Sequence, residues 1–343
     1  MFNNKEFAVG GVSIAPGKRK QIEIEVAKLY DYTKLTIPVE VIRGKEDGPV
    51  LFLSAAIHGD EINGVEIIKR ILAKKKKLSK IKGTLIAVPI VNVFGFNRNL
   101  RYLPDRRDLN RCFPGSKEGS LAGQIAKIFM DEIVLKSTHG IDLHTAALHR
   151  NNLPQVRACL DSKETEDLAM SFGVPVVLNS SVRDGSLRQC ASEAGVNMLL
   201  FEGGEPLRYE EKIISSGIHG ILSVMKSIGM IEGAVSSKEK RRKAVFISHS
   251  SHWLRAPHSG SLRIKKHLGN HVKKDEILGI ISNPFGEDKY EVKAKKTGII
   301  IGIATMPLVN NGDALFHVAT FENSERVHEQ VEFFDERIEE SLL

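Results

Sequence analysis

The sequence has few cysteines, few aromatic residues and no long hydrophobic run. Its three cysteines, Cys112, Cys159 and Cys190, include no Cys-x-x-Cys pair. This spacing argues against a disulfide framework and against a thiolate metal site. No stretch reaches the ~20 apolar residues of a membrane-spanning helix, and the opening residues lack the apolar core of a signal peptide. We therefore expect a cytoplasmic protein with reduced cysteines and no membrane partner.

Acidic residues are also in deficit, since 49 lysines and arginines face 42 aspartates and glutamates and leave a net charge of +7. Such an excess can indicate a nucleic-acid partner. The basic residues form two runs, 74–77 and 238–243, and no aromatic stacking residues or nucleic-acid motif accompany them. We interpret the first run as the end of a helix and the second as a linker. The sequence predicts no nucleic-acid partner, and a basic substrate pocket explains the charge more simply.

Hydrophobic patterning predicts a large α/β domain. Residues 21–40 alternate between polar and apolar, which is typical of half-buried strands, whereas residues 49–56 are apolar on both faces, as in a strand inside a sheet. Strands that alternate with helices favour a three-layer α/β domain with a mixed sheet. The further predicted strands are 83–91, 140–143, 174–178 and 197–201, and the predicted helices are 61–74 and 120–135.

The C-terminal part has a different pattern, with many short strands, Gly-Asp or Gly-Asn turns and no convincing helix. Residues 260–281 are echoed by residues 298–318, and such a repeat predicts a small all-β barrel-sandwich domain. It resembles the fold of lipoyl and biotinyl carrier domains. The predicted division is a catalytic domain 1–235, a linker 236–243, a β-domain 244–325 and a tail 326–343.

Two short motifs predict a metal site. His58-Gly-Asp-Glu61 lies where a buried strand ends and a helix begins, and His144 ends another short strand 83 residues after Glu61. Two histidines and a glutamate form a ligand set of catalytic zinc. Asp142 lies on the same side of its strand as His144 and is a candidate hydrogen-bond partner for it. Taken singly, His58-x-x-Glu61 is common on surfaces, and His144 also fits a hydrogen-bonded core histidine.

Other polar residues are placed to bind substrate or move a proton. Arg101 lies in a basic loop that also contains Asn110 and Arg111, whose amide and guanidinium donors suit a substrate carboxylate. Glu202 directly follows four apolar residues, so partial desolvation would make it a stronger base. Glu205 is the rival candidate. A solvated basic loop remains the alternative for the arginines.

Together these blocks resemble the succinylglutamate desuccinylase/aspartoacylase family, relatives of the zinc carboxypeptidases. The resemblance rests on four ordered blocks between residues 49 and 204: His58-Gly-Asp-Glu61, Arg101-Tyr to Asp108-Leu-Asn-Arg111, Asp142-Leu-His144 and Glu202-Gly-Gly204. It implies a zinc-carboxypeptidase-like domain that binds one zinc ion per chain and cleaves the amide bond of a small anionic N-acyl amino acid or acyl-amine. Homo-oligomers are compatible with the sequence but are not indicated by it.

The same resemblance implies a role for each matched residue. Glu202 matches the glutamate that activates water and later protonates the leaving amine, and Arg101 matches an arginine near the scissile carbonyl. Asn110 and Arg111 match the pair that binds a substrate carboxylate. Arg188 corresponds to a further substrate-binding arginine. The matches to the zinc ligands are His58, Glu61 and His144.

Three alternatives stay open at this point. The same metal site would also serve a carboxypeptidase that acts on peptides. A non-enzymatic carrier would use Lys289, in the turn between the half-repeats, as a modified lysine, although such a lysine is ordinarily just solvated. Several C-terminal histidines invite a second metal site, but no carboxylate or cysteine at ligand spacing completes one. These histidines are His249, His252, His258, His267 and His271.

Overall fold

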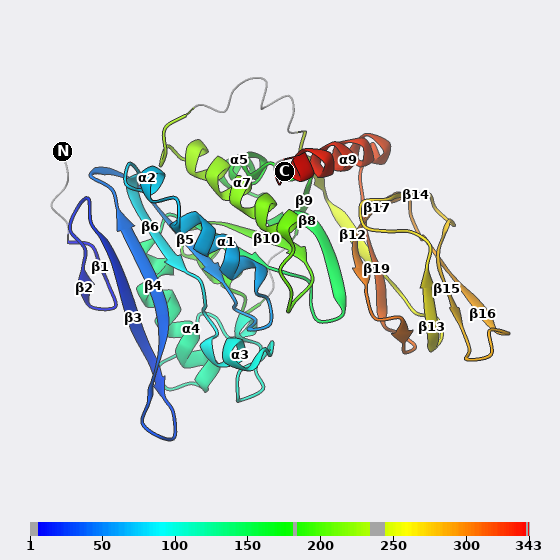
Figure 1. Ribbon diagram of the computed structural model, residues 1–343, viewed down its shortest axis with the longest axis horizontal. Helices are drawn as coiled ribbons and strands as arrows, with labels where there is room; N and C mark the ends of the chain where they lie inside the picture. The colour runs from blue at the N-terminus through cyan, green and yellow to red at the C-terminus, as the bar shows by residue number, and fades with distance from the viewer. Residues whose placement is uncertain (1–5, 181–183, 234–243, 341, 343) are drawn as a thin grey trace.

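The computed structural model describes residues 6–180, 184–233, 244–340 and 342, and one large mixed sheet runs through it (Figure 1). The strand order along this sheet is β12-β19-β17-β8-β10-β7-β5-β6-β4-β3, and β9, β11 and β14 join at its side. Strands β10, β7, β5 and β6 are parallel neighbours, whereas β8, β4 and β3 pair antiparallel. The strands of the catalytic part are β3 (Arg19–Lys28), β4 (Lys34–Arg43), β5 (Glu46–Ala55), β6 (Lys82–Val88), β7 (His139–His144), β8 (Arg150–Ala158), β9 (Val176–Asn179) and β10 (Asn197–Gly204), with a separate hairpin of β1 (Ala8–Val9) and β2 (Val12–Ser13).

Strand β5 is central because both of its faces are apolar. Leu51 and Leu53 enter the hydrophobic core on one face of the sheet, and Phe52 between them enters the core on the other face. Successive side chains of a strand point to opposite faces, so only a strand covered on both sides carries such a run. The prediction of a buried strand at residues 49–56 is confirmed.

Helices cover both faces of the sheet and give the predicted three layers. The core on one face includes residues of α1, α5 and α7, and the core on the other includes residues of α4 and α6. None of the helices in the described ranges is long and apolar enough to cross a membrane. The helices are α1 (Asn63–Leu72), α2 (Lys75–Leu78), α3 (Val93–Arg98), α4 (Leu121–Glu132), α5 (Lys163–Phe172), α6 (Leu187–Glu193), α7 (Glu211–Ser227) and α9 (Ser324–Glu340), with short 3₁₀ turns η1 (Leu109–Arg111) and η2 (Val134–Lys136).

The C-terminal strands form a second sheet that faces the end of the large one. The order of the second sheet is β16-β15-β13-β18, and one apolar core lies between it and β12, β17 and β19. Strand β17 also pairs antiparallel with β8, so the large sheet continues from the catalytic part into this β-region. The strands are β11 (Phe246–Ser248), β12 (Ser250–Arg255), β13 (Gly260–Ile264), β14 (His271–Val272), β15 (Ile277–Ser282), β16 (Lys289–Lys293), β17 (Gly298–Ala304), β18 (Leu308–Val309) and β19 (Ala314–Thr320).

The expectation of no helix after the linker is wrong, because α9 spans Ser324–Glu340. Its buried residues Val327, Val331, Phe334 and Ile338 recur at helical spacing, and the last two enter the same core as α7. The pattern is present in the sequence, but charged residues surround it and give a low mean hydropathy. The predicted linker 236–243 lies outside the described residues.

Candidate active site

The candidate metal ligands lie at the carboxyl ends of two neighbouring strands. His58 and Glu61 are in the loop between β5 and α1, and His144 is the last residue of β7. Because β5 and β7 are parallel and adjacent, both ends reach the same edge of the sheet. Gly59 lets this loop lie against α3, since a Cβ there would be 2.0 Å from the Gly95 carbonyl carbon. This edge is where open α/β sheets bind ligands.

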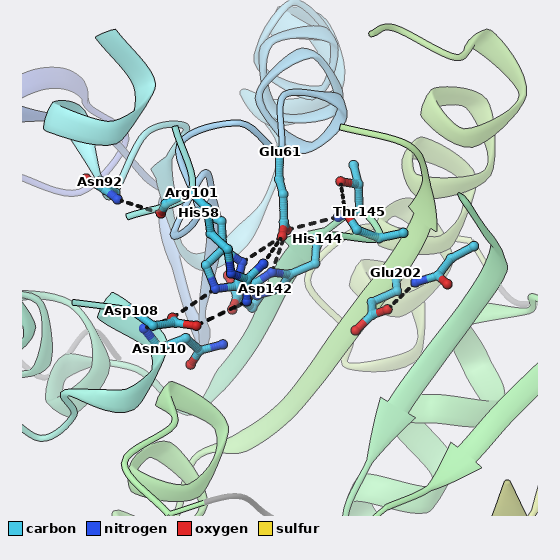
Figure 2. Close-up of polar contacts among 12 residues, drawn as sticks. His58, Glu61, Asn92, Arg101, Asp108, Asn110, Asp142, His144, Thr145 and Glu202 are labelled. Atoms are coloured by element: carbon cyan, nitrogen blue, oxygen red, sulfur yellow. Dashed lines mark hydrogen bonds and ion pairs between the residues drawn. The ribbon is translucent and has the colours of Figure 1, made fainter. Parts of the chain in front are cut away.

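The three side chains converge on one buried point (Figure 2). The Nδ1 atom of His58 is 2.7 Å from Oε1 of Glu61, and Nδ1 of His144 is 2.8 Å from its Oε2. One ligand atom from each residue lies within 4.8 Å of the other two. Among the described residues this is the only group of histidine, cysteine or carboxylate side chains with metal-binding geometry.

Carboxylates fix the far side of both imidazole rings. Nε2 of His58 is 3.0 Å from Asp108, and Nε2 of His144 is 2.6 Å from Asp142, whose other oxygen accepts a hydrogen bond from Ser54. Such partners orient a ligating histidine and hold its tautomer. Both rings therefore turn Nδ1 toward Glu61, and the sequence-based pairing of Asp142 with His144 has the expected geometry.

The electrostatics of this group favour a bound cation. Burial alone would raise the pKa of Glu61, but His58 and His144 outweigh it and hold the pKa well below its usual range. Burial also opposes ionisation of Asp108, yet His58 and Arg101 keep its pKa below the usual range. Glu61 and Asp108 are thus held in the ionised form that a metal ligand and its hydrogen-bonding partner need. Two Nδ1 atoms and a carboxylate form the His₂Glu donor set that catalytic zinc uses.

Glu202 lies on β10, beside the metal-ligand group (Figure 2). It is the register partner of His144, so the two side chains leave neighbouring strands at the same level. Oε2 of Glu202 accepts hydrogen bonds from Asn152 and, at 3.3 Å, from Arg157, both on β8. The rival Glu205 accepts a hydrogen bond from Thr305 and does not line the cavity.

A cavity of about 280 Å³ contains the candidate ligands, Glu202 and every predicted substrate-binding residue. Arg101 donates to Glu61 and to Asp108, both at 3.1 Å, so it is anchored to the metal-ligand group. Arg188 donates to Ser180. The lining residues predicted from the sequence are His58, Glu61, Arg101, Asn110, Arg111, His144, Arg188 and Glu202.

Four further residues at the site were not predicted from the sequence. Asn152, Arg150 and Arg157 lie on β8, and Trp253 lies on β12 of the β-region; all line the cavity. Polar residues in a strand ordinarily face solvent, so the sequence of β8 does not indicate that its polar side chains line a cavity. A tryptophan in a β-region ordinarily belongs to the hydrophobic core, so Trp253 gives no signal of this site either. Only the pairing of β8 with both β10 and β17 brings them here.

The alternatives drawn from the C-terminal histidines and Lys289 gain no support from the geometry. In the described part of the chain, none of these histidines belongs to a metal-binding group. His258 stacks on Tyr290, and His271 pairs with Ser324. Lys289 is exposed at the start of β16, as expected for a lysine that is simply solvated. The three cysteines are free, as expected.

Comparison with known proteins agrees with the geometry. A family model described as the succinylglutamate desuccinylase/aspartoacylase catalytic domain matches residues 47–228, more than half of the chain. The N-alpha-acetyl-L-2,4-diaminobutyric acid deacetylase of Halomonas elongata is 25% identical over 295 residues, which are 82% of this chain and 85% of the relative.

Two solved structures have the same fold. A succinylglutamate desuccinylase/aspartoacylase from Rhodobacter sphaeroides is 25% identical with a TM-score of 0.76, and the match covers 88% of this chain and 96% of that one. The product-bound ectoine utilization protein EutE (DoeB) from Ruegeria pomeroyi is 22% identical with a TM-score of 0.79, over 88% and 95% of the two chains.

These comparisons place the chain among deacylating enzymes of the hydrolase class. The chain belongs to the succinylglutamate desuccinylase/aspartoacylase family. This confirms the family predicted from the sequence, and with it a deacylating hydrolase of non-peptide amide bonds.

Proposed function

We propose that this protein is a zinc-dependent deacylase that cleaves the amide bond of a small, anionic N-acyl amino acid or related acyl-amine. His58, Glu61 and His144 would hold one zinc ion per chain. The observation that carries the proposal is the buried convergence of two imidazole Nδ1 atoms and a carboxylate beside Glu202, in one arginine-lined cavity. When bound, zinc would supply Lewis-acid chemistry, which polarises a carbonyl and makes water a stronger nucleophile.

Glu202 acts as the general base and then as the general acid. It takes a proton from the water as the new C–O bond forms and the carbonyl oxygen becomes an oxyanion. It then gives that proton to the amine nitrogen as the C–N bond breaks and the carboxylate product forms. Asn152 and Arg157 both donate to Oε2 of this carboxylate. Its Oε1 has no hydrogen-bond partner among the described residues and is therefore the oxygen that would accept the proton. The carboxylate is therefore already oriented before substrate arrives.

The arginines position the substrate and stabilise developing charge. Arg101 is fixed beside the ligand group by Glu61 and Asp108, where its guanidinium can stabilise the oxyanion that forms from the scissile carbonyl. Asn110 and Arg111 bind a substrate carboxylate, and Arg188 adds a further donor. A cavity of about 280 Å³ that is walled by Trp253 suits a small acyl amino acid better than a peptide.

Several finer expectations accompany this proposal. We retain the division into a catalytic domain 1–235 and a β-domain 244–325 with a barrel-sandwich fold like that of lipoyl carriers. The continuous pairing of β8 with β17 makes the two parts one sheet across that boundary. A cytoplasmic location remains a prediction.

A substrate panel tests the proposed function. Purified protein is assayed with N-acetyl, N-succinyl and longer N-acyl amino acids, before and after removal of metal with a chelator and again after zinc is added back. We expect hydrolysis of at least one N-acyl amino acid, its loss on chelation and its return with zinc. Cleavage of C-terminal residues from peptides at a higher kcat/KM would favour the carboxypeptidase instead.

A further inference from the structure

The loop between β10 and α7, residues 205–210, connects the strand that carries Glu202 to the loop that carries Glu61. It follows Gly204, which ends β10 two residues after Glu202, and it ends at Glu210, directly before α7. Its other side lies against the metal-ligand loop. The relative placement of the proposed base and a candidate metal ligand therefore depends on how this loop is held.

Two hydrogen bonds hold this loop against the metal-ligand loop. The backbone N–H of Leu207 donates to the Asp60 carbonyl at 2.9 Å. The N–H of Glu210 donates to Oδ1 of the buried Asn63 at 3.0 Å. Asp60 directly precedes Glu61, and Asn63 is the first residue of α1. The loop thus contacts the chain on both sides of Glu61.

The carboxylate of Glu210 closes the loop onto the end of β10. Its Oε1 accepts a hydrogen bond from the backbone N–H of Glu205 at 2.6 Å. Glu210 occupies the N-cap position of α7, where a side chain ordinarily accepts from the first turn of its own helix. Its side chain makes no such bond to α7, which lies wholly within the described residues. The carboxylate instead holds the chain that follows Glu202, and a charged acceptor makes this hydrogen bond stronger than a neutral one would.

The space around Gly204 shows how closely these side chains pack on the end of β10. Gly204 has a φ of +80°, and a Cβ there would lie 2.7 Å from Oε1 of Glu210 and 2.9 Å from Nδ2 of Asn63. The Gly204 carbonyl accepts a hydrogen bond from the N–H of Ala146, two residues after His144. The end of β10 is therefore held between the segments that carry the candidate metal ligands, and Glu210 completes the contact on the side of α1.

We propose that Glu210 is a positioning residue that sets the place of Glu202 relative to the metal ligands, because it holds loop 205–210 on the end of β10. This inference rests on the proposed function, in which Glu202 is the base beside a metal held by Glu61. Glu210 does not line the cavity, so it acts through the backbone of the loop. A misplacement of about 1 Å can cost on the order of 100-fold in rate. The loss of Glu210 therefore lowers turnover more than it weakens substrate binding.

Substitutions at Glu210 test this role in steady-state kinetics on the N-acyl amino acid that the substrate panel identifies. Glu210→Ala should lower kcat at least tenfold, change KM less than threefold and leave the zinc content unchanged. Glu210→Asp should cause a similar loss, because it keeps a carboxylate at the start of α7 but is one methylene shorter. Glu210→Gln should recover most of the rate, since its amide oxygen can still accept from the Glu205 N–H. Wild-type kcat in Glu210→Ala and Glu210→Asp would overturn the proposal.

Two comparisons distinguish positioning from general damage to the fold. Glu211→Gln is the matched control, because Glu211 is the neighbouring carboxylate and binds Arg70 of α1, and it should keep wild-type kcat. In a Glu202→Gln background the base is already lost, so Glu210→Ala should lower the residual kcat less than threefold. A tenfold loss in that background, or an equal loss in Glu211→Gln, would mean that Glu210 is only structural.

Amide hydrogen exchange tests the contact itself and separates this proposal from the proposed function. Exchange is followed residue by residue in zinc-loaded wild-type protein, Glu210→Ala and Glu211→Gln. The N–H groups of Glu205 and Leu207 should exchange at least tenfold faster in Glu210→Ala alone. That result supports the role of Glu210 in holding the loop even if no N-acyl amino acid is hydrolysed, which would refute only the function. Unchanged exchange in Glu210→Ala would overturn the proposal.

Discussion

Gly302 on β17 connects the β-region to Glu202, the proposed general base, and its replacement by alanine is an informative perturbation. Gly302 is the register partner of Asn152, whose side chain donates to Glu202. A Cβ at position 302 would lie 2.9 Å from Oδ1 of Asn152 and 3.3 Å from Cη2 of Trp253. The first distance is shorter than real Cβ contacts and the second is tighter than most of them, so we expect the Asn152 side chain to shift and weaken its hydrogen bond to Glu202.

The expected loss follows from that hydrogen bond. A hydrogen bond to a charged group is worth about 1.5–3 kcal/mol. If the loss of this hydrogen bond raises the activation free energy by that amount, kcat decreases roughly 10–100-fold, at about 1.4 kcal/mol per tenfold. Asn152→Ala should cause a similar loss, and the double variant should be no worse than either single one, because both act on the same contact.

Steady-state kinetics, zinc content and a thermal melt of Gly302→Ala check this prediction. Gly123→Ala is the matched control, since it makes the same chemical change in α4 and its Cβ would have no neighbour closer than 3.6 Å. It should retain wild-type kcat. A Gly302→Ala protein with normal zinc content, melting temperature and kcat would refute the role of β17 in holding Glu202.

Three further predictions concern the base, the ligand support and the C-terminal helix. Glu202→Gln should retain zinc and lower kcat by roughly 10²–10⁴-fold, as measured by hydrolysis and elemental analysis; full activity would exclude Glu202 as the base. Asp142→Asn should weaken zinc affinity about 10–100-fold in a chelator competition, because His144 loses its anionic partner; an unchanged affinity would contradict that support. Phe334→Ala should destabilise the fold by about 3–5 kcal/mol in denaturant unfolding, since this α9 side chain is 4% exposed; a loss below 1 kcal/mol would show that α9 does not pack as described.

The parts of the site that were predictable lie on single, locally patterned segments. Residues 49–56 are apolar on both faces, so His58 and Glu61 could be placed at the end of a central strand. The pattern Ile141-Asp-Leu-His144 alternates, so Asp142 and His144 could be placed on one side of their strand. In these cases the local periodicity determines the geometry.

The parts that could not be predicted depend on which strands become neighbours. Asn152 and Arg157 reach Glu202 only because β8 pairs antiparallel with β10, and Trp253 reaches the cavity only because β17 adds to β8. Neither pairing leaves a local signal, since both join segments far apart in the sequence. Asp108 bridges His58 and Arg101 through a loop whose path has no periodicity.

We propose that His58, Glu61 and His144 hold the zinc ion on which hydrolysis depends. The most direct measurement is a zinc titration of metal-free protein, with bound zinc per chain and hydrolysis of an N-acyl amino acid followed in the same samples. We predict that activity rises with bound zinc and reaches a plateau at one ion per chain, and that Glu61→Ala shows neither. Full activity in metal-free protein, or normal zinc binding by Glu61→Ala, would contradict the account.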